Sequence, residues 1–335
     1  MNFLNNIKLK YTSDLLNQSI EKNEFSNFQK HYEALKKIDE NVANKYIRYN
    51  SFDFIEKEEL NFLFNQNIIW ANSFRKKDTD LVTNFISQIF ALTSNTKIQH
   101  LNFYEEVLKT LSEEEIKDYQ FVNDVFLKSH YYFQMIIDNQ NPGVKLMNTN
   151  SAFFEYNSKI HFTHHKLTKC LFYILKHPYQ IFSELKQEGL TPQAALNVLC
   201  NLENKPTMME IHKNGKVLSC PENSSSWENN VLSWTNDNVQ TSLRGLIIFY
   251  DDLLADTEDK LITIAAHLKE AGFEIELNPL EISKIAEKFK FDQRNTIPIE
   301  ISNNEKKLID RDCGALIEKF FSGKTLNYQN ALNAK

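Results

Sequence analysis

A lysine, a serine hydroxyl and a histidine close the apolar run that begins at Val125. The run reads Val-Phe-Leu-Lys-Ser-His and ends at His130. A run of apolar residues suits a strand buried on both faces, and the carboxyl end of such a strand is where an open α/β sheet binds its ligands. A histidine accepts a proton near neutral pH, and Lys128 can neutralise an oxygen that gains negative charge. The run therefore predicts a strand over 124–128 that ends in a general base and a cation.

A second group of polar residues follows another apolar run, at 68–71. The stretch 72–80 is polar and is predicted to be a loop, and apolar residues recur at helical spacing over 81–92. Backbone N–H groups at the start of a helix can bind a phosphate. A strand, a loop and a helix in this order therefore predict an anion site, although a charged run is also typical of a solvated loop. The candidate binding residues of the loop are Arg75, Lys76, Lys77 and Thr79.

Further apolar runs at 170–175 and 246–250 are each followed by a polar turn and a helical pattern. Strands that alternate with helices predict an α/β fold with a central, mainly parallel sheet flanked by helices. Residues 1–66 are polar with apolar residues at helical spacing, which predicts a helical N-terminal extension. Residues 67–335 then form the α/β domain. A small hairpin is expected at 208–220, because Asn214-Gly215 is a strong turn signal.

Composition limits the classes of protein that this chain can belong to. A surplus of positive charge on a protein attracts nucleic acid. This chain has a net charge of −6, so no nucleic-acid partner is expected. No apolar run reaches the ~20 residues of a membrane span, and the first residues lack the pattern of a signal peptide. A cytoplasmic location is expected. The four cysteines are scattered without a CxxC pair, which indicates reduced thiols rather than a zinc site or a disulfide framework.

Two other groups of residues have structural interpretations. His161, His164 and His165 would share one face if their segment were helical, but without a HExxH pattern they favour surface residues, and no metal is expected. Asp252 is expected to cap a helix that begins near Leu253.

These segments, in their order along the chain, resemble the sulfotransferases that use 3′-phosphoadenosine 5′-phosphosulfate (PAPS). The resemblance covers about residues 68–330. Phe74–Leu81 resembles the family's phosphosulfate loop, Tyr-Pro-Lys-Ser-Gly-Thr-Thr-Trp, and 125–130 resembles its Lys-Thr-His strand end. Four further segments match the family's 3′-phosphate segment, a helix, its Arg-Tyr-Glu-Asp-Leu element and a helix ending in Ser-Phe; they are Tyr173–Ser183, Trp227–Trp234, Ile247–Asp256 and Ile282–Asp292.

The resemblance implies an activity and a role for each matching residue. PAPS would donate a sulfuryl group to a hydroxyl or amine acceptor, with His130 as the general base. Lys76 and Lys128 would neutralise charge in the transition state, and no metal would be needed. The residues implied to bind the nucleotide are Arg75, Lys76, Lys77, Thr79, Lys176 and Ser183. His130, Lys128, Lys76 and Lys176 are accordingly expected to converge on one cleft at the carboxyl ends of the strands.

The chain departs from the family pattern at the nucleotide site. Asp78 stands in the place of the loop glycine and brings negative charge toward an anion site. Lys176 replaces an arginine, which removes two-pronged binding of phosphate. Glu184 occupies the family's serine position, with Ser183 one residue early. The carboxyl-terminal Arg-Lys-Gly-x-x-Gly loop is absent from the sequence.

These departures leave three functions open. The first is PAPS-dependent sulfuryl transfer to an acceptor that the sequence does not identify. The second is a catalytically degenerate protein of the same fold that binds a partner, with the N-terminal helices as its docking surface. The third, a nucleoside-phosphate kinase, is disfavoured because the GxxxxGK[ST] motif is missing.

Overall fold

The structure is a computed structural model of the chain. It describes residues 3–22, 24–40, 42–43, 65–93, 97–110, 130–140, 143–156, 160–200, 207–213, 216–222, 225–289 and 301–323. The predicted strand at 124–128, with Lys128, lies outside these residues. The chain divides into two compact units. The first comprises Met1–Asn67, Thr110–Pro142 and Glu155–Leu167, and the second comprises Ile68–Lys109, Gly143–Phe154 and Thr168–Lys335. The predicted domain boundary between residues 66 and 67 stays a prediction.

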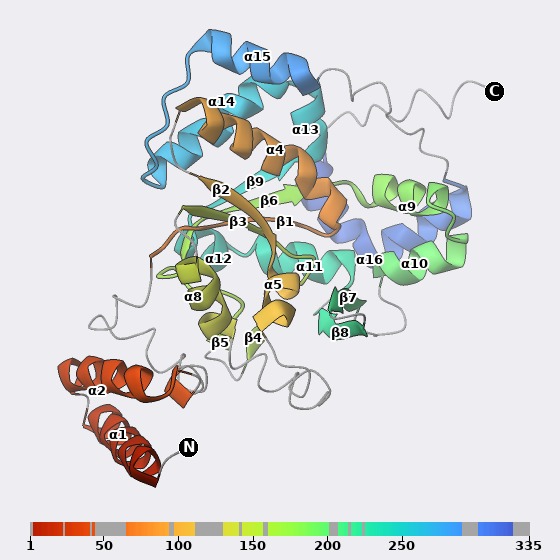
Figure 1. The fold of residues 1–335 in the computed structure, drawn as a ribbon. Coiled ribbons are helices and arrows are strands. Elements are labelled where there is room, and N and C mark those ends of the chain that lie inside the picture. The colour runs from red at the N-terminus through yellow and green to blue at the C-terminus, as the bar shows by residue number, and fades with distance from the viewer. Residues whose placement is uncertain are drawn as a thin grey trace. The chain divides into compact units, whose positions relative to one another are not determined.

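The second unit contains a parallel sheet of five described strands in the order β2-β3-β1-β6-β9 (Figure 1). This confirms the predicted mainly parallel sheet, and the apolar runs at 68–71, 170–175 and 246–250 form β1, β6 and β9. The strands are β1 (Ile68–Ser73), β2 (Ile98–Asn102), β3 (Val144–Asn148), β6 (Thr168–Leu175) and β9 (Gly245–Phe249).

Strands β2 and β3 are not predicted from the sequence, because polar residues interrupt their apolar pattern. Gln99 and His100 lie within β2, at the edge of the sheet. Lys145 lies within β3 and is fully buried, and its Nζ donates a hydrogen bond to the Gly143 carbonyl at 2.9 Å. A lysine can occupy an interior strand when its ammonium donates a hydrogen bond to a nearby backbone carbonyl. A pattern of hydrophobic residues does not reveal such a strand.

Helices cover both faces of the sheet (Figure 1). On one face, Ile69 and Ala71 of β1 share an apolar core with three helices, α4 (Lys76–Thr93), α14 (Thr257–Glu270) and α15 (Pro279–Phe289). Side chains of a strand alternate between faces, so Trp70 points to the opposite side, where its ring meets Phe103 of α5 (Phe103–Thr110). The other helices of this unit are α9 (Pro178–Gln187), α10 (Pro192–Cys200), α11 (Trp227–Trp234), α12 (Asp237–Ser242), α13 (Tyr250–Ala255) and α16 (Asn303–Phe321).

The first unit contains the predicted N-terminal helices. Helices α1 (Phe3–Glu21) and α2 (Phe25–Ile38) pack on each other and bury the periodic apolar side chains, which confirms helices over this stretch. The buried side chains are Leu16, Phe28, Tyr32 and Leu35. Residues 44–64, the remainder of the predicted helical extension, lie outside the described residues. The unit also contains α8 (His130–Gln140), β4 (Glu155–Tyr156) and β5 (Ile160–His161).

Two local predictions have different outcomes. The hairpin is confirmed: β7 (Thr207–Lys213) pairs antiparallel with β8 (Lys216–Glu222), with Lys213 opposite Lys216. The cap at Asp252 is wrong, because α13 begins at Tyr250 directly after β9. Asp252 therefore lies within the first turn of the helix, where the positive end of the helix dipole favours a carboxylate.

At Gly143, just before β3, we expect that replacing glycine by alanine lowers the stability of the fold strongly. Its φ is +107°, and an added Cβ would lie 2.2 Å from the Lys97 carbonyl oxygen. Gly143→Ala is therefore expected to lower the free energy of unfolding by about 2–4 kcal/mol, since backbone strain and a clash with backbone add. The matched control is Gly189→Ala, which has φ +94° but no atom within 4 Å of the new Cβ. It should cost about 1 kcal/mol. Equal losses in urea unfolding would refute the clash.

Candidate anion site

The segment predicted to be a loop over 72–80 is mostly strand and helix, so the prediction is wrong there. Strand β1 continues through Ser73, because Asn72 and Ser73 pair with β6 and the Asn72 side-chain oxygen accepts a hydrogen bond from the Thr149 N–H at 3.1 Å. Helix α4 begins at Lys76, with Asp78 in its first turn. A carboxylate is favourable in that turn, which explains why the helix starts earlier than the apolar pattern indicates. The connection between strand and helix is short.

The sheet topology brings the ends of β1 and β6 together at a switch point. Chain connections leave β1 toward β2 on one side and leave β6 toward β9 on the other. Open α/β sheets bind ligands in the crevice outside the carboxyl ends of strands at such a point. Arg75 and Lys77 follow β1, and Lys176 follows β6. The topology therefore gathers three of the predicted nucleotide-binding cations where a ligand is expected.

Lys176 is buried among groups that satisfy its ammonium. Its side chain is 4% exposed, and its Nζ lies 2.8 Å from Oδ1 of Asp78. It also pairs with the carboxylate of Glu184 on α9. The Tyr250 ring lies 4.1 Å from Nζ, in cation–π geometry. Two carboxylates and an aromatic face thus surround the cation that the family resemblance assigns to the 3′-phosphate.

The other two cations are paired in the same way. Glu184 lies 3.4 Å from Arg75 and 2.9 Å from Lys77, measured between nitrogen and carboxylate oxygen. Glu188, the C-cap residue that follows α9, lies 2.6 Å from both. Glu184 therefore contacts Arg75, Lys77 and Lys176 together. We call Arg75, Lys77, Asp78, Lys176, Glu184 and Glu188 the charge cluster.

Burial and ion pairing shift the pKa values of the charge cluster in opposite directions. Burial raises the pKa of Asp78, and the neighbouring Lys176 offsets this only in part. Burial acts to lower the pKa of Lys176, but nearby negative charge, chiefly that of Asp78, outweighs it and raises the pKa. Burial acts to raise the pKa of Glu188, but hydrogen bonds from Lys77 and Arg75 hold it below its usual value. Lys176 therefore stays charged at neutral pH.

Three buried polar atoms beside or near the cluster lack a hydrogen-bond partner among the described residues. They are Oδ2 of Asp78, Oγ of Ser183 and Nδ2 of Asn72. Burying a carboxylate oxygen without a donor favours the protonated acid, which agrees with the raised pKa of Asp78. Thr79, next to Asp78, is also buried. Lys76 is the first residue of α4.

His177 fixes the start of α9, the helix that carries Glu184 and ends just before Glu188. Its Nδ1 accepts a hydrogen bond from the Tyr179 N–H at 3.2 Å, and its ring packs against Tyr179 and Phe321. Burial, with a smaller contribution from Lys306, lowers the pKa of His177 to about 3. The neutral ring therefore stabilises the folded state.

The His177 pKa predicts a loss of stability in acid. Because the folded value of about 3 lies below the ordinary value near 6.5, this contribution is present above pH 6.5 and is lost as the pH falls toward 3. From pH 7 to pH 5 the loss is roughly 2 kcal/mol. His177→Asn keeps an acceptor for the cap but does not titrate, so its unfolding free energy should fall less over this range. Both proteins are compared at pH 8 to separate any loss of packing. Parallel pH profiles would contradict the assignment.

His130 lies in the first unit, as the first residue of α8. It is fully buried, and its ring meets Phe162 edge-on at 5.0 Å between centroids. Nearby, Thr163 donates to Gln134 at 2.5 Å, and Gln134 donates to the Phe162 carbonyl at 2.7 Å. The placement of this unit relative to the sheet is not determined. The shared cleft of His130, Lys128, Lys76 and Lys176 therefore stays a prediction.

The histidine group at 161–165 does not have the helical arrangement considered above. His161 ends β5, and His164 and His165 follow in a turn, with ring centroids 4.0 Å apart. Burial, with neighbouring positive charge, lowers the pKa of His164 to about 3. Within the described ranges, no group of three or more His, Cys, Asp or Glu residues could hold a metal ion. None of the described helices is long and apolar enough to cross a membrane.

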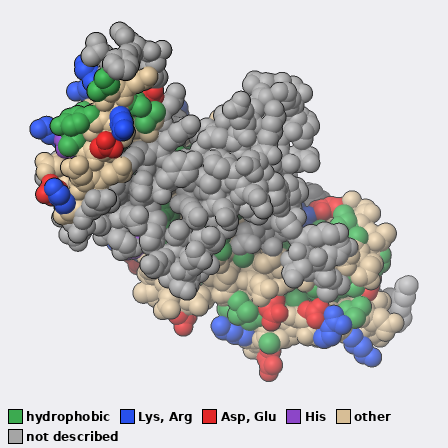
Figure 2. Space-filling model, turned by 90° about the horizontal axis from the view of Figure 1, so that it is seen from below, with side chains coloured by type: hydrophobic (Ala, Val, Ile, Leu, Met, Phe, Trp, Pro, Cys, Tyr) green, Lys and Arg blue, Asp and Glu red, His purple; other side chains and the backbone are tan. Residues whose placement is uncertain are grey.

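The surface offers no single charged face in the view of Figure 2. Among the described side chains seen there, Lys and Arg are interspersed with Asp and Glu. The expectation that nucleic acid is not a partner stays a prediction.

The sequence indicates only some of the residues that contact the cations of the charge cluster. Glu184 stood out because it takes the place of a serine. Glu188 and Tyr250 were not assigned to the site. The spacing of Glu184 and Glu188, four residues apart at the end of an amphipathic helix, is the signal that could have indicated a shared face. The contact of Tyr250 with Lys176 depends on the pairing of β6 with β9, for which the sequence carries no local signal.

Comparisons with known proteins find similarity in structure only. No family model matches the chain, and no curated protein matches its sequence. Two solved structures to which it is similar are mouse sulfotransferase SULT7A1 complexed with PAP, and retinol dehydratase in complex with androsterone and the inactive cofactor PAP. The first is 17% identical and the match covers 79% of this chain and 94% of that chain, with a TM-score of 0.46. The second is 11% identical, with 86% and 88% covered and a TM-score of 0.41.

Proposed function

We propose that this chain is a sulfotransferase-like protein that has lost PAPS-dependent transfer and acts as a binding module. The observation that carries the proposal is the charge cluster. Three cations of the candidate nucleotide site, Arg75, Lys77 and Lys176, are already paired with carboxylates of the chain itself. A nucleotide phosphate would have to displace these carboxylates from Lys176, Arg75 and Lys77.

The charges within the cluster sum to zero. Three cations, Arg75, Lys77 and Lys176, meet three carboxylates, Asp78, Glu184 and Glu188. PAPS carries a 3′-phosphate and a phosphosulfate, so its binding requires a surplus of positive charge. Transfer requires in addition a cation that is directed at the oxygen on which charge develops. A site that is neutralised from within supplies neither.

The partner surface that we propose is the helical N-terminal extension. Helices α1 and α2 pack on each other, yet Tyr11 and Ile7 of α1 remain 65% and 52% exposed. Exposed aromatic and aliphatic side chains are typical anchors of protein interfaces. The partner proposed here is therefore a protein, and the location that we expect for both is the cytoplasm.

Calorimetry with 3′-phosphoadenosine 5′-phosphate (PAP), the stable product of transfer, tests the proposal. The full chain is titrated with PAP up to millimolar concentration at pH 7.5, with ATP as a control for unspecific nucleotide binding. We expect no saturable heat with either nucleotide. Binding of PAP in the micromolar range, without comparable binding of ATP, would overturn the proposal.

A second candidate is PAPS-dependent transfer to a hydroxyl or amine, with His130 as base and with Lys76 and Lys128 neutralising charge. One observation favours it: the topology gathers Arg75, Lys77 and Lys176 at the switch point, where a ligand site is expected. In this candidate the nucleotide would bind through these cations, Thr79 and Ser183 after displacing the carboxylates. Labelled sulfate that appears on an acceptor mixture incubated with PAPS, and fails to appear with His130→Ala, would support it.

A further inference from the structure

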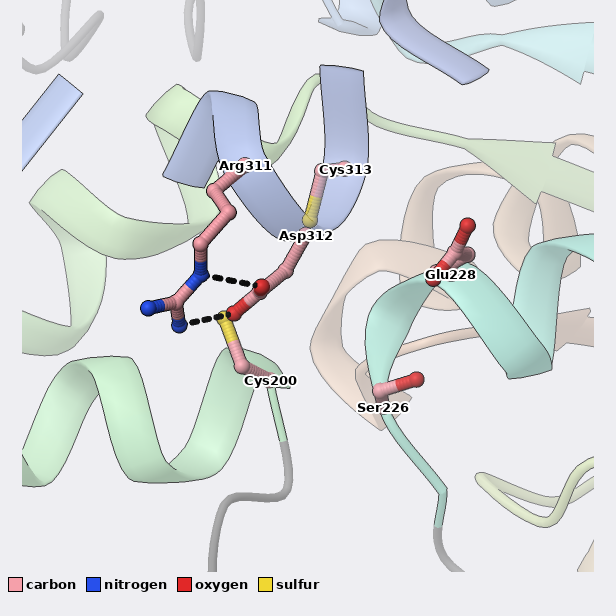
Figure 3. Close-up of a pocket in the computed structure, with 6 residues that line it drawn as sticks. All are labelled: Cys200, Ser226, Glu228, Arg311, Asp312 and Cys313. Carbon is pink, nitrogen blue, oxygen red and sulfur yellow. Dashed lines mark hydrogen bonds and ion pairs between the residues drawn. The ribbon is translucent and has the colours of Figure 1, made fainter. Parts of the chain in front are cut away.

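A pocket away from the charge cluster contains two cysteine thiols. It has a volume of about 360 Å³ and is lined by Cys200, Ser226, Glu228, Arg311, Asp312 and Cys313. These residues come from the end of α10, the start of α11 and the middle of α16 (Figure 3). Figure 3 shows the Cys200 and Cys313 side chains pointing toward one another from α10 and α16.

The two thiols are neighbours in the pocket, close enough for Cys200 to raise the pKa of Cys313. Cys200 also lies beside Asp312 and contributes to the lowered pKa of that carboxyl group. Arg311 holds this carboxylate from the other side, with Nε and Nη2 at 2.7 Å and 2.9 Å from its oxygens. Helices α10 and α16 pack on each other, so the pairing of the thiols is part of a tertiary contact.

We propose that Cys200 and Cys313 are a thiol oxidation site that forms a reversible disulfide with a peroxide as the oxidant. The Cys200 sulfur attacks one oxygen of hydrogen peroxide, the O–O bond breaks, and water leaves with the thiol proton. The Cys313 sulfur then attacks the resulting sulfenic sulfur, and a second water leaves. In sum, two thiols and one peroxide give one disulfide and two waters, with both sulfurs oxidised and the peroxide reduced.

The surroundings of the thiols indicate the order of these steps. Cys200 is partly exposed to the pocket, whereas Cys313 is buried. The neighbouring Cys200 thiol, burial and nearby negative charge raise the pKa of Cys313. A thiol whose thiolate is disfavoured reacts slowly with peroxide, so Cys200 reacts first and Cys313 resolves the sulfenic acid. The acidic surroundings also predict that millimolar peroxide and minutes to hours are needed.

A disulfide here would fasten α16 to α10 next to the helix that carries Glu184. Helix α9 is tied to α16 by the Tyr179–Asp310 hydrogen bond and by the Lys186–Glu305 ion pair at 3.3 Å. The bond would close a loop that runs from residue 200 to residue 313. A loop of that length restricts the unfolded chain strongly, so the oxidised protein is expected to melt up to about 10 °C higher.

Mass spectrometry of the full chain treated with hydrogen peroxide tests the proposal. We expect a mass lower by about 2 Da, because two thiol hydrogens are lost, and a peptide pair that links residues 200 and 313 and is split by a reductant. Cys170 is the internal control, because burial raises its pKa to about 12 and it should remain a free thiol. Cys200→Ser should abolish the link and the rise in melting temperature.

Two results would overturn the proposal. One is the addition of oxygen to Cys200 without a link to Cys313. The other is an unchanged thiol content after hours in millimolar peroxide. Both are read on the wild-type chain, so the test does not depend on the folding of any variant. The binding of PAP is a separate measurement, and neither of its outcomes affects this one.

Discussion

Exchanging Asp78 and Glu184 for their amides is expected to create a nucleotide site in a chain that otherwise binds no PAP. The Asp78→Asn, Glu184→Gln variant keeps the size of both side chains but leaves Lys176, Arg75 and Lys77 with fewer counter-charges. One carboxylate ~6 Å from one phosphate charge, at an effective dielectric of ~20, repels it by roughly 3 kcal/mol. Removing one such repulsion tightens binding about 100-fold, and removing two tightens it further.

Calorimetry with PAP measures this gain, on the wild type and the variant side by side. Asp259→Asn is the matched control: it removes a 56% exposed carboxylate on α14 that pairs with Lys260, outside the charge cluster. The control should behave as wild type. Glu188→Gln should have an intermediate effect, because Glu188 is 41% exposed and solvent screens its charge. Equal affinities of wild type and double variant would show that the cluster does not keep phosphate out.

Removing the Lys176 ammonium is expected to cause the largest loss of stability of any change in the cluster. Lys176→Met leaves Asp78, which is 2% exposed, without the cation that pairs with it. Breaking a buried pair by removing one partner costs about 3–5 kcal/mol, because the remaining charge is buried without compensation. Urea unfolding at pH 7.5 measures the loss. Lys260→Met is the matched control, since its pair with Asp259 lies at the surface and contributes at most about 1 kcal/mol.

A double-mutant cycle separates charge from packing at Lys176. When Lys176→Met is combined with Asp78→Leu, no buried carboxylate faces the new methionine, and much of the lost stability should return. The two changes are therefore expected to be non-additive by about 2–3 kcal/mol. The loss from Lys176→Met alone should also shrink as the pH falls, because the raised pKa of Asp78 lets it protonate. Additive losses with no dependence on pH would mean that the pair is only packing.

The alternation of strands and helices could be predicted because three of the strands carry uninterrupted apolar runs. β1, β6 and β9 are such strands. β3 could not be predicted, because Lys145 interrupts its apolar pattern. This lysine can be buried because its ammonium donates a hydrogen bond to the Gly143 carbonyl. The start of α4 was placed too late because its first turn is polar, and the apolar pattern alone does not show that Asp78 belongs to a helix.

The composition of the site could be predicted only on its cationic side. The family resemblance implies a binding role for Arg75, Lys77 and Lys176, and the sheet brings them together. That the chain also supplies their counter-ions follows from how α9 packs, with Glu184 directed at all three. Such pairing across about 100 residues leaves no local pattern in the sequence. The position of His130 relative to these residues stays a prediction.

A crystal structure of the wild-type chain grown with millimolar PAP would test the claim that the charge cluster keeps the nucleotide out. We predict that the Lys176 ammonium remains within hydrogen-bond distance of Asp78 and Glu184, as it is without nucleotide. No nucleotide should then lie at the carboxyl ends of β1 and β6. A phosphate of PAP in contact with Lys176, with Asp78 or Glu184 turned away, would contradict the claim and favour the transferase.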